Sequence, residues 1–216
     1  MDSDELWTTI DAEQGSLADL LAGLTPQEWE HPSWCAGWWV RDVAAHLTLA
    51  HIGATEALPA FVRARGSFDR MVRDTALAAA VAPTEEPVAG IRAIIGSRRH
   101  AVGTTGFEPL LDVLVHGQDI ARPLGRDRPM PPAAAATAAT RAWRMGWPFW
   151  ARRRLRGASL VATDSDRRAC AGPSVCGTTG DLLLLVTGRR QVLPGLSGPG
   201  WPCSEECRRG AADEGL

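Results

Sequence analysis

The chain has 216 residues, which is enough for one large domain or for a main domain with a small appendage. Its formal net charge is -2, so no basic surplus favours binding to nucleic acid or to an anionic membrane. The longest leucine-rich run, residues 182–186, is too short to span a bilayer, and the acidic residues 2–5 are not the basic start of a secretory signal. These features predict a cytoplasmic protein whose partners are neither nucleic acid nor membrane.

The cysteine and lysine content of the chain excludes further classes of site. The five cysteines are odd in number and form no Cys-x-x-Cys pair, so free thiols in a reducing compartment are expected. Every basic residue is Arg, and Lys, Asn and Tyr are absent, which indicates a GC-rich source genome. Without Lys the chain has neither a Schiff-base lysine nor the lysine of a nucleotide-binding P-loop.

The N-terminal part of the chain has the apolar spacing of helices. This spacing predicts helices over residues 3–23, 39–58, 67–81, 84–99, 107–122 and 131–146, with helix resuming after Pro59. Between the first two, residues 25–28 form a capping box with Pro26 at the first helical position, which predicts a helical turn carrying Trp29. Long helices joined by short loops are typical of a helical bundle, here residues 1–150.

The C-terminal part of the chain has a different sequence pattern, with short strands as well as helix. An aromatic stretch at 143–150, followed by three arginines, predicts the domain boundary. Beyond it we expect a strand at 158–163, a second short strand starting at Val175, and a helix at 179–188. Residues 151–200 are too few for a full domain of their own. Residues 193–216 contain little apolar surface and are expected to be poorly ordered, above all the tail 201–216.

The stretch 110–120 carries the most distinctive pattern. As a helix it is apolar over most of its circumference, and Asp112, His116 and Asp119 fall on one narrow arc. A buried carboxylate and imidazole must be paired or bind a metal. Asp112 and His116 are four residues apart and therefore meet on one helix face, but that spacing also suits an ordinary surface charge pair. Asp119 could hold a ligating histidine in place, or could form a salt bridge with Arg122 or Arg126.

A metal site on this arc needs a third ligand from another element. We assign it to His46 on the second helix, although helical angles place His51 deeper in the apolar stripe and therefore do not favour this choice. Two nitrogens and one oxygen suit a divalent ion such as zinc with an open position for a further ligand. Cys35, in a tryptophan-rich loop, is interpreted as a small buried residue rather than a nucleophile.

Two sequence blocks carry a resemblance to a known family. The first comprises residues 24–29 (LTPQEW), 32–38 (PSWCAGW) and 40–47 (VRDVAAHL), and the second comprises residues 112–125 (DVLVHGQDIARPLG). Together they resemble the mycothiol-dependent maleylpyruvate isomerase family, whose N-terminal domain is one of the DinB-like four-helix bundles. The resemblance implies a mainly α fold, with a small α/β C-terminal appendage that is reduced in this chain.

The resemblance also implies a site. In the family a divalent metal, typically zinc, is bound by the histidine after the Gly-Trp turn and by an acidic residue and a histidine four apart, here His46, Asp112 and His116. The acidic ligand is often Glu, so Asp112 is one methylene shorter. The residue after Gly-Trp is commonly Thr or Ser, whereas Trp39 offers no capping oxygen. An arginine in the C-terminal half serves activity, and Arg189 is our choice of counterpart.

These implications define the expected function. We expect a metal-dependent isomerase or thiol S-transferase that uses mycothiol as cosubstrate and acts on a small electrophile, as a monomer or homodimer. A GC-rich actinobacterial source would be consistent with mycothiol. Two alternatives are a metal-binding module without catalysis, either regulatory or degenerate, and a metal-dependent hydrolase that activates water.

Overall fold

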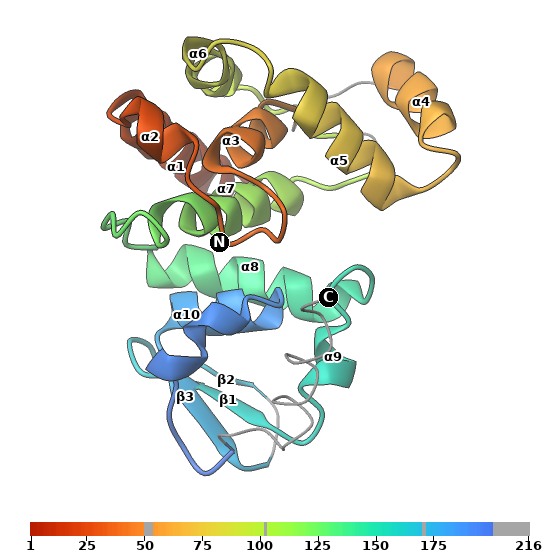
Figure 1. The fold of residues 1–216 in the computed structure, drawn as a ribbon. Helices are drawn as coiled ribbons and strands as arrows, with labels where there is room; N and C mark the ends of the chain where they lie inside the picture. Colours follow the sequence, from red (N-terminus) through yellow and green to blue (C-terminus); the bar gives the residue numbers. More distant parts are fainter. Residues whose placement is uncertain (50–53, 102, 170–171, 201–216) are drawn as a thin grey trace. The chain divides into compact units, whose positions relative to one another are not determined.

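A computed structural model describes residues 1–49, 54–101, 103–169 and 172–200 (Figure 1). The chain divides into two compact units, Met1–Pro129 and Met130–Leu216. The expected boundary near residue 150 therefore lies inside the second unit. The difference arises because the alanine-rich helix at 132–145 packs on the C-terminal helix at 179–186. Within the described part, no helix is both long and apolar enough to cross a membrane.

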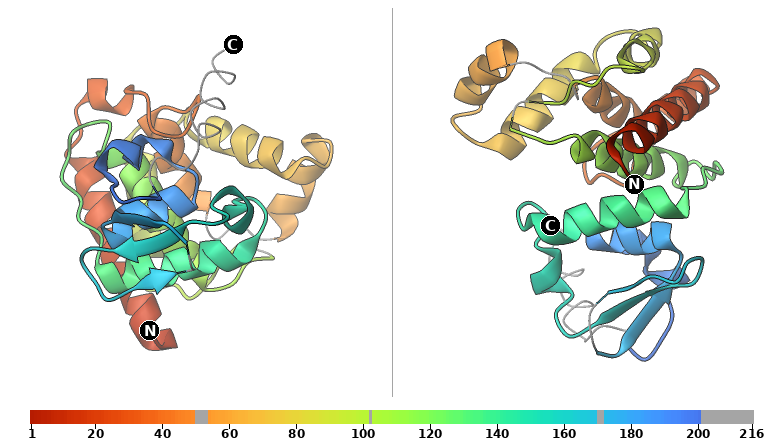
Figure 2. Two further views of the ribbon diagram at one scale, coloured as in Figure 1. Left: turned by 90° about the horizontal axis from the view of Figure 1, so that it is seen from below. Right: turned by 180° about the vertical axis from the view of Figure 1, so that it is seen from behind.

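The first unit is built from helices, which follow one another along the chain. Their bounds are α1 Ser3–Ala22, α2 Pro26–Trp29, α3 Val40–Thr48, α4 Ala54–Arg63, α5 Phe68–Ala79, α6 Glu85–Ile94 and α7 Phe107–Ala121. Four of them form a closed ring in which α1 packs on α6 and α7, and α3 packs on the same two helices (Figures 1 and 2). Helix α5 packs against α3, and α4 packs against α5. This ring is the predicted four-helix bundle.

Local sequence signals account for several of the helix ends. The Asp2 side chain accepts a hydrogen bond from the Glu5 backbone N–H at the start of α1. The capping box that begins α2 is present, with Thr25 and Glu28 bonded reciprocally. Inside the ring, the largest fully buried side chains come from all four helices: Ile10, Leu17, Leu21, Val40, Val43, Ile91, Leu110 and Leu114.

The single long helix predicted over residues 39–58 is wrong in its length. Helix α3 ends at Thr48, and α4 runs from Ala54 to Arg63 with Pro59 inside it. The apolar spacing continues across the gap, so periodicity alone did not reveal where α3 ends. His51, the competitor of His46, lies outside the described residues.

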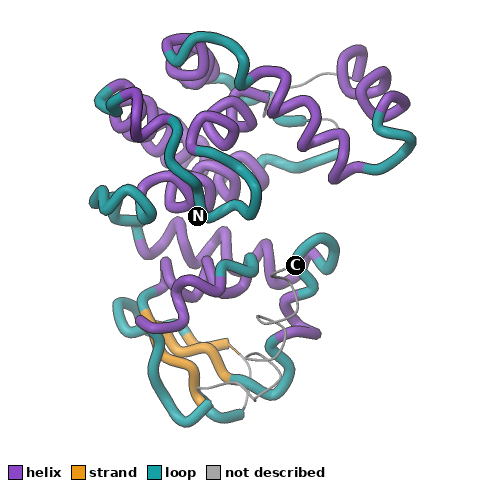
Figure 3. The backbone as a smooth tube through the Cα atoms, viewed as in Figure 1, coloured by secondary structure: helices purple, strands orange, loops and turns teal. Residues whose placement is uncertain are grey.

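The second unit combines helices with a small sheet (Figure 3). Its elements are α8 Pro132–Met145, α9 Ala151–Arg154, β1 Ser159–Ala162, β2 Arg168–Ala169, β3 Ser174–Gly177, α10 Thr179–Val186 and the 3-10 helix η2 Arg190–Gly195. The strand order is β2-β1-β3, with β1 parallel to β3 and antiparallel to β2. Helix α8 packs on α10, and its buried residues are alanines, among them Ala135 and Ala138. The chain is thus mainly α with a small α/β portion, as predicted.

The expectation of poor order over residues 193–216 is wrong for its first part. Residues 190–195 form η2, and Ser197 pairs with Cys176 through both backbone hydrogen bonds, at 2.7 and 2.9 Å. Val192 and Leu196 are buried, and η2 packs against α10, so this segment belongs to the core of the second unit. The tail 201–216 lies outside the described residues.

Candidate metal centre

Helix α7 is buried on nearly all sides, as its apolar pattern predicts. Leu110, Leu114 and Ile120 are fully buried, and the Asp119 side chain is equally inaccessible. Asp112 and His116 are the partly accessible members of the polar arc. A fully buried carboxylate must have partners, and the structure supplies two for Asp119.

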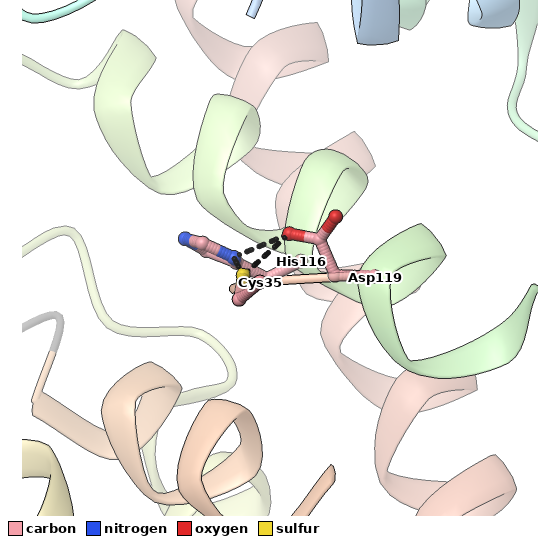
Figure 4. Close-up of side chains that lie close together, drawn as sticks. All are labelled: Cys35, His116 and Asp119. Carbon is pink, nitrogen blue, oxygen red and sulfur yellow. Dashed lines mark hydrogen bonds and ion pairs between the residues drawn. The ribbon is translucent and has the colours of Figure 1, made fainter. Parts of the chain in front are cut away.

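Asp119 binds an imidazole and a thiol (Figure 4). Its Oδ2 accepts a hydrogen bond from His116 Nδ1 at 2.9 Å and another from Cys35 Sγ at 3.0 Å. The Cys35 sulfur also lies 3.6 Å from His116 Nδ1. The Asp119 carbonyl in turn accepts from the Trp34 backbone N–H at 3.0 Å, so the loop before α3 is fixed to α7 by side chain and backbone together.

Cys35 is the residue of this site that sequence reasoning missed. Its thiol, His116 and Asp119 place one ligand atom each within 4.8 Å of one another, which makes them a possible metal-binding triad. Across the described residues, this is the group of three that meets that distance, and His46 and Asp112 are not members of it. The available signal was position, since Cys35 precedes the helix that carries His46 by only a few residues.

His46 lies next to His116. The two rings meet edge to face, with centroids 5.0 Å apart and an interplanar angle of 85°, and Trp38 makes a similar contact with His46 at 5.6 Å. Burial, together with the charge of His116, lowers the pKa of His46 to about 3. His46 is therefore neutral at physiological pH and keeps a nitrogen lone pair available for a metal.

The pKa of His116 is shifted in the opposite direction from that of His46. Burial by itself lowers its pKa, but the hydrogen bonds with Asp119 and Cys35 outweigh burial and raise the pKa to about 10. Since Nδ1 donates to Asp119, the second ring nitrogen, Nε2, faces away from the triad (Figure 4). A metal bound at Nε2 would replace a proton there, while Asp119 kept the ring orientation fixed.

Asp112 lies on the wall of a cavity of about 150 Å³ that His46 also lines. Most of the other lining side chains are apolar, and they come from α3 and the residue after it, from α4, from α5 and from the start of α7: Leu47, Leu49, Ala57, Phe68, Met71, Val72 and Pro109. Glu108 lines the cavity too, and its carboxylate accepts a hydrogen bond from the Thr105 backbone N–H at 2.7 Å at the start of α7. The proposed ligand Asp112 therefore lies beside a small apolar space.

The arginines and the tryptophan named in the sequence analysis have the following partners. Arg126 binds Glu28 at 2.6 Å, and Arg122 Nε donates to the Gln118 side chain at 2.7 Å. Arg189 belongs to the second unit, where its Nη1 donates to the Thr187 carbonyl at 3.1 Å. Trp39 begins α3 without a side-chain cap, as predicted, and its backbone N–H donates to Asp42 Oδ2 at 2.8 Å.

The Gly-Trp turn and the helix that carries His46 belong to a stretch that matches a known domain. Residues 10–102 match the mycothiol maleylpyruvate isomerase N-terminal domain. The resemblance predicted from the two sequence blocks is thus confirmed for the first block, and the second block lies beyond the matched residues.

Solved structures show the same fold over almost the whole chain. The structure of the mycothiol-dependent maleylpyruvate isomerase superposes with a TM-score of 0.63 at 15% sequence identity, covering 92% of this chain and 93% of that chain. A mutant of that enzyme, with one histidine replaced by alanine, gives the same TM-score and coverage at 14% identity. No curated protein matches the sequence.

Proposed function

We propose that the chain is a divalent-metal protein that uses mycothiol to isomerise, or to transfer a thiol to, a small electrophile. The observation that carries this proposal is the contact of His46 with His116 beside the apolar cavity that contains Asp112. The match to the mycothiol maleylpyruvate isomerase N-terminal domain supports the choice of thiol. A reducing, cytoplasmic location would keep such a thiol available and stays a prediction.

The donor set fits a divalent metal. His46, His116 and Asp112 would hold it, and two imidazoles with one carboxylate are the donors that zinc takes in sites with an open position. His46 is neutral, and Asp119 orients the His116 ring through Nδ1, which are the conditions that imidazole ligands require. The bound ion would lower the pKa of a thiol so that the reactive thiolate forms near neutral pH.

The protein's own groups would position the substrate. The apolar side chains from α5 form part of the cavity wall, and Asp112 and Glu108 place two carboxyl groups on it. In an isomerisation the thiol sulfur adds to one carbon of a double bond and leaves again after rotation about the resulting single bond, so the thiol is returned. In a transfer the carbon–sulfur bond is kept and a proton is added to the neighbouring carbon.

A second candidate rests on the triad. If Cys35, His116 and Asp119 bound the metal together, they would give it a thiolate, an imidazole and a carboxylate from the protein. Such a site would suit a metal-binding module without catalysis. The two candidates differ in whether Cys35 or His46 is a ligand, and this difference is testable. The hydrolase alternative uses the first ligand set but no thiol.

Cobalt substitution separates these possibilities in one experiment. In cobalt-loaded protein we expect no thiolate-to-cobalt absorption until mycothiol is added, because Cys35 is not a ligand in the favoured site. The Cys35→Ser variant should behave in the same way, and His46→Ala should lose the metal. Cobalt content is measured by elemental analysis of each variant alongside the spectrum.

The other outcomes are equally clear. A thiolate band present before mycothiol is added, and absent in Cys35→Ser, would assign the metal to the triad. A cobalt spectrum that mycothiol does not change would contradict the thiol-dependent function and favour the hydrolase. Full cobalt occupancy in the His46→Ala protein would overturn the favoured ligand set.

A further inference from the structure

The second unit concentrates positive charge. Residues 130–200 contain ten Arg against three Asp and no Glu, although the whole chain has a net charge of -2. Four of these arginines line one cavity of about 340 Å³ within that unit, here called the arginine cavity. They come from separate elements: Arg144 from α8, Arg152 from α9, and Arg167 and Arg168 from the turn before β2 and from β2 itself.

The rest of the lining is apolar or aromatic. Leu160, Leu182 and Val186 are buried members of the lining, Trp143 is partly exposed, and several alanines complete the surface. All four arginines are exposed. The cavity thus combines an apolar interior with accessible guanidinium groups, and its volume falls within the range of about 300–1,000 Å³ that small ligands use.

Among the described residues, no acidic side chain forms an ion pair with these guanidinium groups. Within residues 1–49, 54–101, 103–169 and 172–200, other arginines pair with acids: Arg92 with Asp19, Arg126 with Glu28 and Arg128 with Glu13. In that same part of the chain, the side chains of Arg144, Arg152, Arg167 and Arg168 form no hydrogen bond or ion pair, and the cavity lining contains no acidic side chain.

The carboxylate of Asp164 lies near the cavity. Asp164 contacts Thr179, which is a lining residue, but its Oδ1 already accepts hydrogen bonds from the Thr179 backbone N–H at 2.8 Å and hydroxyl at 2.6 Å. Burial raises the pKa of Asp164, yet these hydrogen bonds outweigh burial and lower the pKa overall. Asp164 is therefore engaged at the start of α10. It does not neutralise the four arginines of the cavity.

We propose that the arginine cavity binds a small organic anion that carries two or more negative charges, on carboxylate or phosphate groups, and has an apolar or planar body. Guanidinium groups bind these acids through paired hydrogen bonds, and several of them around one cavity favour more than one negative charge. The apolar lining and the Trp143 ring provide contact area for the body of the ligand. This site lies wholly within the second unit and shares no residue with the metal centre.

Calorimetric titration with four probes tests the ligand class. Phenyl phosphate and phthalate both have an acidic head and a planar body, and the tighter of the two identifies phosphate or carboxylate as the preferred acid. Dimethyl phthalate keeps the body without the charge, and inorganic phosphate keeps the charge without the body. We expect each of these two to bind at least about tenfold more weakly than the better acidic probe.

A matched pair of double variants tests the residues. Arg144→Gln/Arg168→Gln removes two cavity arginines, and Arg153→Gln/Arg156→Gln removes two exposed arginines of the same unit that do not line the cavity. We expect the first pair to weaken binding of the better acidic probe by at least about tenfold and the second to leave it unchanged. Circular dichroism checks folding, and Arg144→Lys/Arg168→Lys, which keeps the charge but loses the fork, should weaken binding to a smaller extent.

Four results would overturn the proposal. They are no binding of either acidic probe, equal weakening by both double variants, inorganic phosphate binding as tightly as phenyl phosphate, and binding only after residues 201–216 are removed. The last result would make the acidic tail, with Glu205, Glu206, Asp213 and Glu214, the occupant of the cavity.

Discussion

At the scale of single residues, Arg128 joins segments that are far apart in the chain. Its guanidinium is almost completely buried and donates to Ser16 at 2.7 Å and to the Glu13 carboxylate at 2.8 Å. Burial raises the pKa of Glu13 although the Arg128 charge opposes this, and burial also lowers the pKa of Arg128. Removing one partner of such a pair would leave a buried charge unpaired. The Arg128 side chain reaches Glu13 by passing over Gly117 on α7.

Replacing Gly117 by Ala should therefore destabilise the protein. A Cβ at this position would come 2.6 Å from Arg128 Nε, so the buried guanidinium would have to move away from its partners. We expect a loss of about 1–3 kcal/mol in the free energy of unfolding, measured by urea denaturation.

Gly15 in α1 provides the matched control. A Cβ there would meet only the Ile95 side chain at 3.9 Å, so Gly15→Ala should stabilise the protein by about 0.4–1 kcal/mol through the higher helix propensity of Ala. If both substitutions changed stability in the same direction and by the same amount, the contact with Arg128 would not be what requires glycine at 117.

The candidate site divides into what spacing could predict and what it could not. Asp112 and His116 share a helix face because they are four residues apart, and this was visible in the sequence. The contact of Cys35 with Asp119 spans 84 positions and depends on how the loop before α3 folds back on α7. No local pattern specifies such a contact. His46 was chosen by resemblance, and its position next to His116 is what the structure adds.

At the scale of elements, α3 begins in an unusual way. Its N-cap is Trp39, whose backbone has the extended conformation that an N-cap needs, with φ -86° and ψ 165°, but whose side chain forms no cap hydrogen bond. Asp42 compensates in part by accepting the Trp39 backbone N–H. Since Trp39 is about half exposed, at 47%, the side chain can be replaced without opening a large cavity.

Trp39→Thr should make α3 more stable than Trp39→Val. The two replacements have nearly the same shape, but only Thr carries a hydroxyl that can accept a hydrogen bond from the first turn of the helix. We expect the Thr variant to exceed the Val variant by about 1 kcal/mol in the free energy of unfolding, measured by thermal or urea denaturation. Equal stability of the two proteins would show that Asp42 already meets the needs of this helix start.

Elements were predicted well where their signals are local, and poorly elsewhere. The capping box at 25–28 and the core spacing of α1 and α7 depend on neighbouring residues, and these elements lie where they were expected. Strand β2 was not predicted, because it has two exposed residues, Arg168 and Ala169, whose only strand signal is their pairing with β1. The end of α3 was missed for a related reason, since the apolar stripe does not end with the helix.

At the scale of the whole molecule, the near-neutral total charge conceals two opposite parts. Residues 1–129 carry eighteen acidic residues against eleven Arg, whereas residues 130–200 are strongly basic. The proposed metal ligands all come from the first part and the arginine cavity from the second. The two proposed ligand sites should therefore respond to different additives, a cation in one unit and an organic anion in the other.

Metal removal should accordingly loosen the first unit and leave the second unchanged. Helices α3 and α7 supply all the proposed ligands, so a bound ion stabilises their packing by its binding free energy, about 2.7 kcal/mol at a hundredfold excess over the dissociation constant. We expect EDTA to speed amide hydrogen exchange in α3 and α7 by up to roughly a hundredfold where exchange requires them to separate. Peptides from α8 and α10 serve as the internal control and should exchange at the same rate with and without EDTA.

The His116→Ala protein distinguishes the ion from a general effect of the chelator. This variant lacks a proposed ligand, so its exchange should already be fast in α3 and α7 and should not respond to EDTA. Mass spectrometry of peptic fragments measures both proteins under identical conditions. Faster exchange in α8 and α10 of the unmodified protein, equal to that in α3 and α7, would contradict a metal held within the first unit, because those helices contribute none of its ligands.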